Sequence, residues 1–206
     1  LSSRLSQYEG IVISSDGRLI IKPSVSADAN KLAALLNPSL SKIGSFIPSI
    51  FKNIPDGEIE VHVVGYLPIN ARKVIDASGN VHLLFDRYFI ETLINNQNEY
   101  PMAVPWLLGE RVGHELSHNN SIGTPQEERE EEINVIINAD LQLYRNLLAD
   151  KSLKDEVDRF FAEVNSSFGS GHYFEGLLGE IVDKSPAQIR EAVETYVAKG
   201  NMSAPP

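Results

Sequence analysis

Apolar and polar positions alternate along several segments in the first half of the chain, as is typical of strands with one buried face. The segments are residues 8–14, 18–22, 59–66, 72–76 and 80–85. Turn-forming residues separate two of the pairs: Ser-Asp-Gly lies between the first two segments, and Ser78 with Gly79 lies between the last two. The pattern therefore predicts two β-hairpins and a small antiparallel or mixed sheet in the N-terminal half.

In the second half, apolar residues recur instead at steps of three and four, which is typical of amphipathic helices. The predicted helices cover residues 87–94, a segment from about Pro105, and residues 127–150, 153–166, 173–182 and 185–200. In the last of these, Ser185 is the predicted N-cap and Pro186 the first helical residue. Residues 26–53 carry a weaker helical pattern. Strands followed by helices indicate an α+β fold. A chain of 206 residues suits one domain over residues 1–206, with a mainly β lobe at 1–100 and a helical lobe at 101–206.

Composition narrows the possible partners and the possible metal ligands. The formal charge is −10 and no basic cluster is present, which argues against a nucleic-acid or anionic-membrane surface. No apolar run approaches the roughly 20 residues that span a bilayer. The sequence starts at Leu1 rather than Met, which favours removal of a leader and hence an exported protein. Because there are no cysteines, a metal site must use His, Asp and Glu.

The sequence His114-Glu115-Leu116-Ser117-His118 has the form H-E-x-x-H on the helix predicted from Pro105. Residues four apart lie on one face of a helix, so both imidazoles can reach one ion. Glu115 then projects beside the metal, where a carboxylate can accept a proton from metal-bound water. The motif predicts a catalytic zinc site with Glu115 as general base.

A catalytic zinc usually has three protein ligands, so a third is expected downstream. On the helix predicted at 127–150, an apolar stripe faces inward; it consists of Ile133, Ile137, Leu141, Tyr144 and Leu148. Glu130 extends this stripe and is the predicted third ligand, while Glu128, Glu131 and Glu132 are expected to point sideways or to solvent. Glu127 and Glu131 are the alternatives. Asn134 is expected to accept a hydrogen bond from a ligating histidine.

These residues resemble those of the gluzincin metallopeptidases, in which H-E-x-x-H is followed by a glutamate on a later helix, often as E-x-x-x-D or E-x-x-x-N. Glu130 and Asn134 match that second pattern. Upstream, Asn70-Ala71 before a hairpin and a helix is similar to HtpX-like peptidases, whereas the asparagine at position 134 is closer to the ImmA/IrrE-like pattern. The resemblance covers about residues 60–145.

The resemblance implies a zincin-like fold and zinc-dependent hydrolysis of peptide bonds, with water activated by zinc and Glu115. It also implies that a peptide or protein substrate pairs in extended form with an edge strand near residues 80–85. Such enzymes need a donor for the oxyanion, and His172 or Tyr173 in a Gly- and Ser-rich segment is expected to supply it.

A plainer interpretation applies to some of these features. His62 and His82 are expected to be ordinary residues on the faces of strands. The alternative function is that of a non-catalytic binding or regulatory protein on a metallopeptidase scaffold, with a metal that only stiffens the fold. The presence of Glu115 favours the enzyme, because a structural site would not need it.

Overall fold

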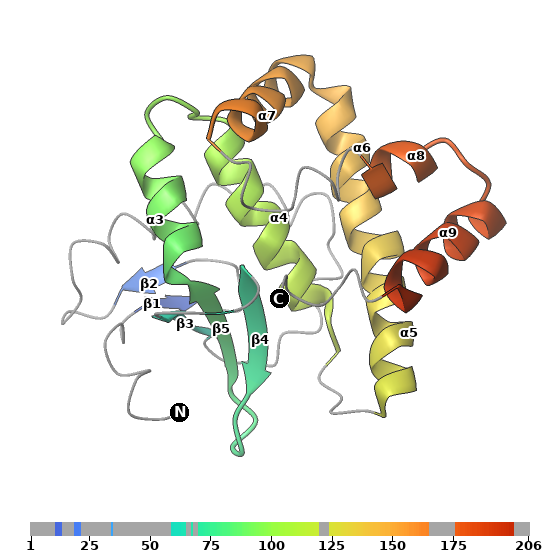
Figure 1. Cartoon of the computed structure of the whole chain (residues 1–206). Coiled ribbons are helices and arrows are strands. Elements are labelled where there is room, and N and C mark those ends of the chain that lie inside the picture. Colours follow the sequence, from blue (N-terminus) through green and yellow to red (C-terminus); the bar gives the residue numbers. More distant parts are fainter. Residues whose placement is uncertain are drawn as a thin grey trace.

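A computed structural model of the chain describes residues 11–13, 19–21, 34, 59–64, 67, 70–119, 124–164 and 176–199. Within these residues, one sheet comes first and a series of helices follows it, which confirms the α+β prediction (Figure 1). Most of residues 26–53, for which helical structure is predicted, lie outside the described part of the chain; residue 34 is helical.

The sheet has five strands in the order β2-β1-β3-β5-β4. Their bounds are β1 Ile11–Ile13, β2 Leu19–Ile21, β3 Ile59–Val64, β4 Ala71–Ile75 and β5 Val81–Asp86. Both predicted hairpins are present, β1 with β2 and β4 with β5, and each pair is antiparallel. Gly79 has a φ of 86°, a left-handed conformation that glycine adopts without a steric penalty, in the turn before β5. The β3–β5 pair is parallel, so the sheet is mixed.

The identity of the edge strand differs from the prediction. Residues 80–85 were expected at the edge, but β5 lies between β3 and β4. The hairpin gives β5 its first neighbour, and the parallel pairing with β3 gives it a second. Among the described strands, β4 is therefore the edge next to β5, and it contacts helix α4.

The helices lie close to the predicted ranges. They are α3 Arg87–Asn96, α4 Ala103–Ser117, α5 Pro125–Val135, α6 Leu141–Ala149, α7 Lys151–Glu163, α8 Gly179–Ile181 and α9 Pro186–Ala198. A π-helical segment, η2, covers Ile136–Asp140 and joins α5 to α6 without a break in the helix. Two helices, α5 and α9, begin with a reciprocal capping box followed by proline. The capping box at Ser185 confirms its predicted role as N-cap.

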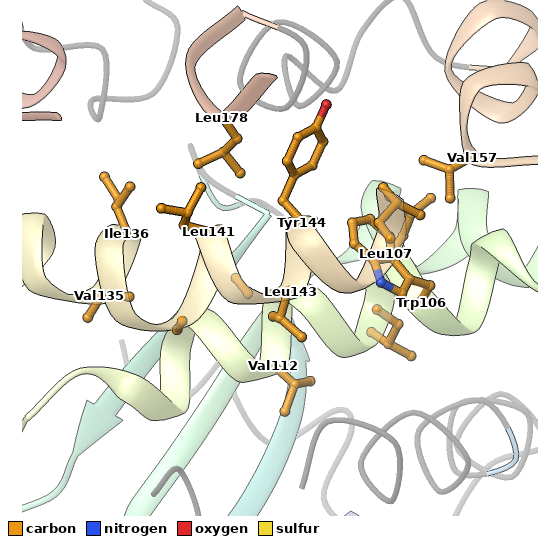
Figure 2. Packing of buried hydrophobic residues seen from close by; sticks show 14 of the residues in the cluster. Trp106, Leu107, Val112, Val135, Ile136, Leu141, Leu143, Tyr144, Val157 and Leu178 are labelled. Atoms are coloured by element: carbon orange, nitrogen blue, oxygen red, sulfur yellow. The ribbon is translucent and has the colours of Figure 1, made fainter. Parts of the chain in front are cut away.

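The hydrophobic core joins the sheet to the helices in one cluster. Helix α4 runs between β4 and the α5–α6 helix, so most of its residues are buried (Figure 1). Figure 2 shows part of the core around α4 and the α5–α6 helix, with Val157 of α7 and Leu178 beside them. In the described part of the chain, no helix is both long and apolar enough to cross a membrane.

Candidate metal centre

The last turn of α4 carries the HELSH sequence and places its first histidine inside the protein. His114 and Glu115 are each only 7% exposed, because α4 is covered on both sides by β4 and by the α5–α6 helix. His118 is the C-cap residue, with extended backbone angles of φ −63° and ψ 130°. The helix therefore ends at the second histidine, whose side chain is more exposed, at 22%, than that of His114, at 9%.

His114, His118 and Glu132 form a compact group that can hold a metal ion. Nε2 of His118 lies 3.3 Å from Nε2 of His114. The Glu132 carboxylate lies 3.4 Å from Nε2 of His114 and 3.3 Å from Nε2 of His118. One ligand atom from each residue lies within 4.8 Å of the others, and in the described part of the chain no other group of three or more His, Asp and Glu residues has this property. The histidines are thus brought together as predicted.

The third member of the group differs from the prediction. Glu130 is exposed and forms an ion pair with Arg190 of α9, so its carboxylate points away from the histidines. It lies two positions before Glu132, which corresponds to a rotation of about 200° around a helix. Glu127 closes the capping box with Thr124. Glu131 is nearer, with an oxygen 4.0 Å from Nδ1 of His118.

The role expected of Asn134 belongs to Asp140. Nδ1–H of His114 donates to Oδ2 of Asp140 over 2.9 Å, and Asp140 is fully buried, whereas Asn134 is exposed. A carboxylate behind a ligating histidine fixes its ring and its tautomer. In the neutral ring, a proton on Nδ1 leaves the lone pair on Nε2, the atom that faces Glu132 and His118 and that a metal ion would bind.

The π-helical segment explains how Glu132 and Asp140 share one face of the helix. In a regular α-helix, residues eight apart are separated by two turns plus about 80°. A π-turn takes in one extra residue, worth about 100°, and brings the two side chains to within about 20° of each other. The predicted inward stripe assumed an unbroken α-helical period. That assumption misplaced both ends of the stripe, since Leu148 is 43% exposed and Glu130 faces α9.

Buried charges surround the histidines. Burial alone lowers the pKa of His114, but the negative charge of Asp140, the hydrogen bond that His114 donates to it, and the charge of Glu132 raise that pKa to about 10. Glu110 lies one turn before His114 and is 3% exposed. Burial raises the pKa of Glu110 to about 7, with opposing contributions from Arg111 and His114 and reinforcing ones from Asp140 and Glu115. Nη2 of Arg111 lies 3.4 Å from Glu110.

Glu115 lies against the edge strand of the sheet. The backbone N–H of Lys73 donates to Oε2 of Glu115 over 2.8 Å, and the Lys73 ammonium donates to the carbonyl of His118 over 2.7 Å. Burial lowers the pKa of Lys73, while Glu131 and Glu115 oppose that change. The end of α4 is thereby attached to β4.

The remaining predictions concern four residues outside this group. His172 and Tyr173, the expected oxyanion donors, lie outside the described residues. His62 and His82 bond to each other across β3 and β5, with 3.0 Å between Nε2 and Nδ1, and Nε2–H of His82 donates to Asp76 over 3.2 Å. Both histidines lie on the sheet face opposite Val61 and Leu83, which point into the core.

Three residues near the histidines were not predicted from the sequence: Lys73, Glu110 and Asp140. A signal for each exists, since each is a charged residue at a position whose neighbours on the same face are apolar. Lys73 shares a strand face with Ala71 and Ile75, and Asp140 interrupts an otherwise apolar helix face. Such positions indicate a buried partner, although the sequence does not say which one.

Searches with this chain against protein-family models, curated proteins and solved structures find no match.

Proposed function

We propose that this protein is a zinc-dependent peptidase whose metal is held by His114, His118 and Glu132. One observation carries the proposal, namely that the Nε2 atoms of the two histidines are 3.3 Å apart, with Oε1 of Glu132 3.4 Å from His114 and Oε2 of Glu132 3.3 Å from His118. Two ligands that are each about 2.05 Å from an ion and meet at a tetrahedral angle are about 3.3 Å apart. Two imidazoles and one carboxylate are also the ligand set of several catalytic zinc sites.

The charge of the group fits a cation. Glu132 is buried, and its Oε1 has no hydrogen-bond partner among the described residues although His114 is nearby. A buried carboxylate is costly unless a proton or a cation compensates it; protonated His114 does so in the metal-free chain, and a metal ion can take that place. Asp140 behind His114 completes the arrangement that metal-binding histidines usually have.

When bound, zinc polarises a carbonyl and lowers the pKa of a water molecule. The chain's own contribution centres on Glu115, which lies between the two histidines in the sequence and is not one of the three assigned ligands. Its Oε2 accepts a hydrogen bond from the Lys73 N–H. We assign Glu115 as the general base that takes a proton from the attacking water and returns it to the leaving amine. The C–N bond then breaks, and water supplies the hydroxyl of the new carboxylate.

The position of β4 supports a peptide as substrate. It is the edge strand beside α4, and an extended peptide can add to such an edge through main-chain hydrogen bonds. The sequence from His114 to His118 resembles the gluzincin motif. That resemblance, and the zincin-like fold that it implies, agree with this reaction. The E-x-x-x-N match of Glu130 and Asn134 does not support it, because both side chains are exposed.

The test is to load metal-free protein with one equivalent of zinc and incubate it with a mixed peptide library, using mass spectrometry to detect cleavage. We expect cleavage by the wild type and none by Glu115→Gln, which keeps the shape and the zinc but loses the basic oxygen. Glu128→Gln, an exposed change on α5, is the matched control and should cleave normally. Zinc binding without any cleavage would instead favour the non-catalytic binding protein with a structural metal.

A further inference from the structure

Lys73 joins the edge strand to the end of α4 by two separate hydrogen bonds. Its backbone N–H donates to Glu115 over 2.8 Å, and its ammonium donates to the His118 carbonyl over 2.7 Å. Both partners are more than 40 residues away along the chain, at separations of 42 and 45 positions. One residue of β4 therefore contacts both the assigned base and one of the assigned metal ligands.

The pairing of β4 explains why Lys73 reaches these groups. Asp86 N–H donates to the carbonyl of Asn70, and Asp76 N–H donates to that of Asn80. The backbone N–H and C=O groups of the even-numbered residues of β4 therefore point toward β5. Backbone groups alternate in direction along an antiparallel strand, so the N–H of Lys73 points outward from the sheet edge. Its side chain lies on the same face as that of Ala71, which is buried toward the core.

His118 needs such a contact more than His114 does. His114 lies within the helix, and Asp140 holds its ring. His118 has already left the helical conformation, and its Nδ1 lies 4.0 Å from the nearest Glu131 oxygen, beyond hydrogen-bond distance. Its carbonyl is also one of the terminal groups that a helix cannot satisfy internally. The Lys73 ammonium bonds that carbonyl at the negative end of the helix dipole.

We propose that Lys73 is a positioning residue of the metal centre, which fixes the His118 backbone and the Glu115 carboxylate relative to each other. This role rests on the proposed function, because it presumes a metal on His118 and a reaction that uses Glu115. The role depends on the Lys73 side chain, which bonds the His118 carbonyl, and on its position in β4, which directs its N–H to Glu115. Removing the side chain should leave the N–H bond to Glu115 in place and release the end of the helix that carries His118.

The chain offers a matched control for the charge. Arg72 is the neighbouring residue on β4, is exposed, and points to the opposite face of the sheet. Lys73→Met and Arg72→Met each remove one positive charge from the same strand. Only the first removes a contact with the metal centre.

The experiment measures the zinc dissociation constant by chelator competition, kcat and KM on a cleaved peptide, and the melting temperature of the metal-free protein. Lys73→Met should bind zinc about 10- to 100-fold more weakly than wild type, the usual effect of losing a partner that orients a ligand. We expect kcat to fall with little change in KM, and Arg72→Met to match wild type. Lys73→Arg should restore most of the affinity, because its guanidinium can donate to the same carbonyl.

Zinc affinity of Lys73→Met within twofold of Arg72→Met, at similar melting temperatures, would overturn the role of Lys73 and leave the proposed function intact. A Lys73→Arg protein as impaired as Lys73→Met would also overturn it. If Lys73→Met does not fold, Lys73→Gln is compared in the same assays with the same expected order. A wild-type chain that does not bind zinc would overturn the proposed function and the role of Lys73 together.

Discussion

Oδ2 of Asp140 lies 2.9 Å from Nδ1 of His114, although the two residues are 26 positions apart and belong to different helices. The contact is made at the end of the π-helical segment, and Asp140 is completely buried there. It fixes the orientation of the first histidine and couples the HELSH sequence to the helix that supplies Glu132.

Replacing Asp140 with asparagine should weaken zinc binding by about 10- to 100-fold, because the amide accepts a weaker hydrogen bond from His114 and carries no charge. The shape of the side chain is kept, so the fold should persist. Isothermal titration calorimetry with zinc measures the effect. Asp183→Asn, an exposed change, is the control, and equal affinities in the two variants would show that Asp140 does not support the site.

Glu110 should make the stability of the metal-free protein depend on pH. Its folded pKa of about 7 lies above the ordinary value of 4.5, so the folded state holds its proton more tightly than the unfolded state. The resulting stabilisation is present below pH 4.5 and is lost as pH rises toward about 7. At about 1.4 kcal/mol per pH unit, the loss is on the order of 3 kcal/mol.

Glu110→Gln imitates the protonated acid and should remove this trend. We expect the variant to be more stable than wild type at pH 8 and similar to it at pH 4.5, as measured by urea unfolding in the presence of a chelator. Glu180→Gln, on an exposed side chain, controls for the loss of one negative charge. A Glu110→Gln protein with the same pH dependence as wild type would refute this assignment.

Zinc should stabilise the folded chain, because the group of His114, His118 and Glu132 exists only when α4 and α5 are packed together. At a free zinc concentration 100 times the dissociation constant, the gain in unfolding free energy should be about 2.7 kcal/mol. Thermal unfolding with zinc and with a chelator measures this difference. His118→Ala should lose the zinc-dependent part, and a melting temperature unaffected by zinc in the wild type would contradict the proposed site.

Much of the fold could be predicted from local pattern. Alternation identified the strands, and Ser185 followed by Pro186 marked the start of α9, because capping and strand burial depend on neighbouring residues. The order of strands was not predictable in this way. Whether β5 lies at an edge depends on its parallel pairing with β3, which joins residues 22 positions apart, with β4 between them in the sequence.

The same distinction between local and long-range features applies to the candidate site. The four-residue spacing of His114 and His118 is a property of one helix, so the sequence was sufficient for both. The choice between Glu130 and Glu132 depended on the rotation of a second helix, and the π-helical segment changes that rotation by about one residue. A run of five acidic residues around Arg129 offers a carboxylate in every direction, so composition alone could not select one.

The most direct test of the proposed metal site compares zinc binding by Glu132→Gln and Glu130→Gln, two changes of the same kind on one helix. Metal content after dialysis and the zinc dissociation constant are measured for both variants and for wild type. We expect about one zinc per wild-type chain, at least about 100-fold weaker binding by Glu132→Gln, and unchanged binding by Glu130→Gln, whose carboxylate pairs with Arg190. Strong binding by Glu132→Gln, or loss of zinc from Glu130→Gln alone, would contradict the assignment of Glu132 as the third ligand.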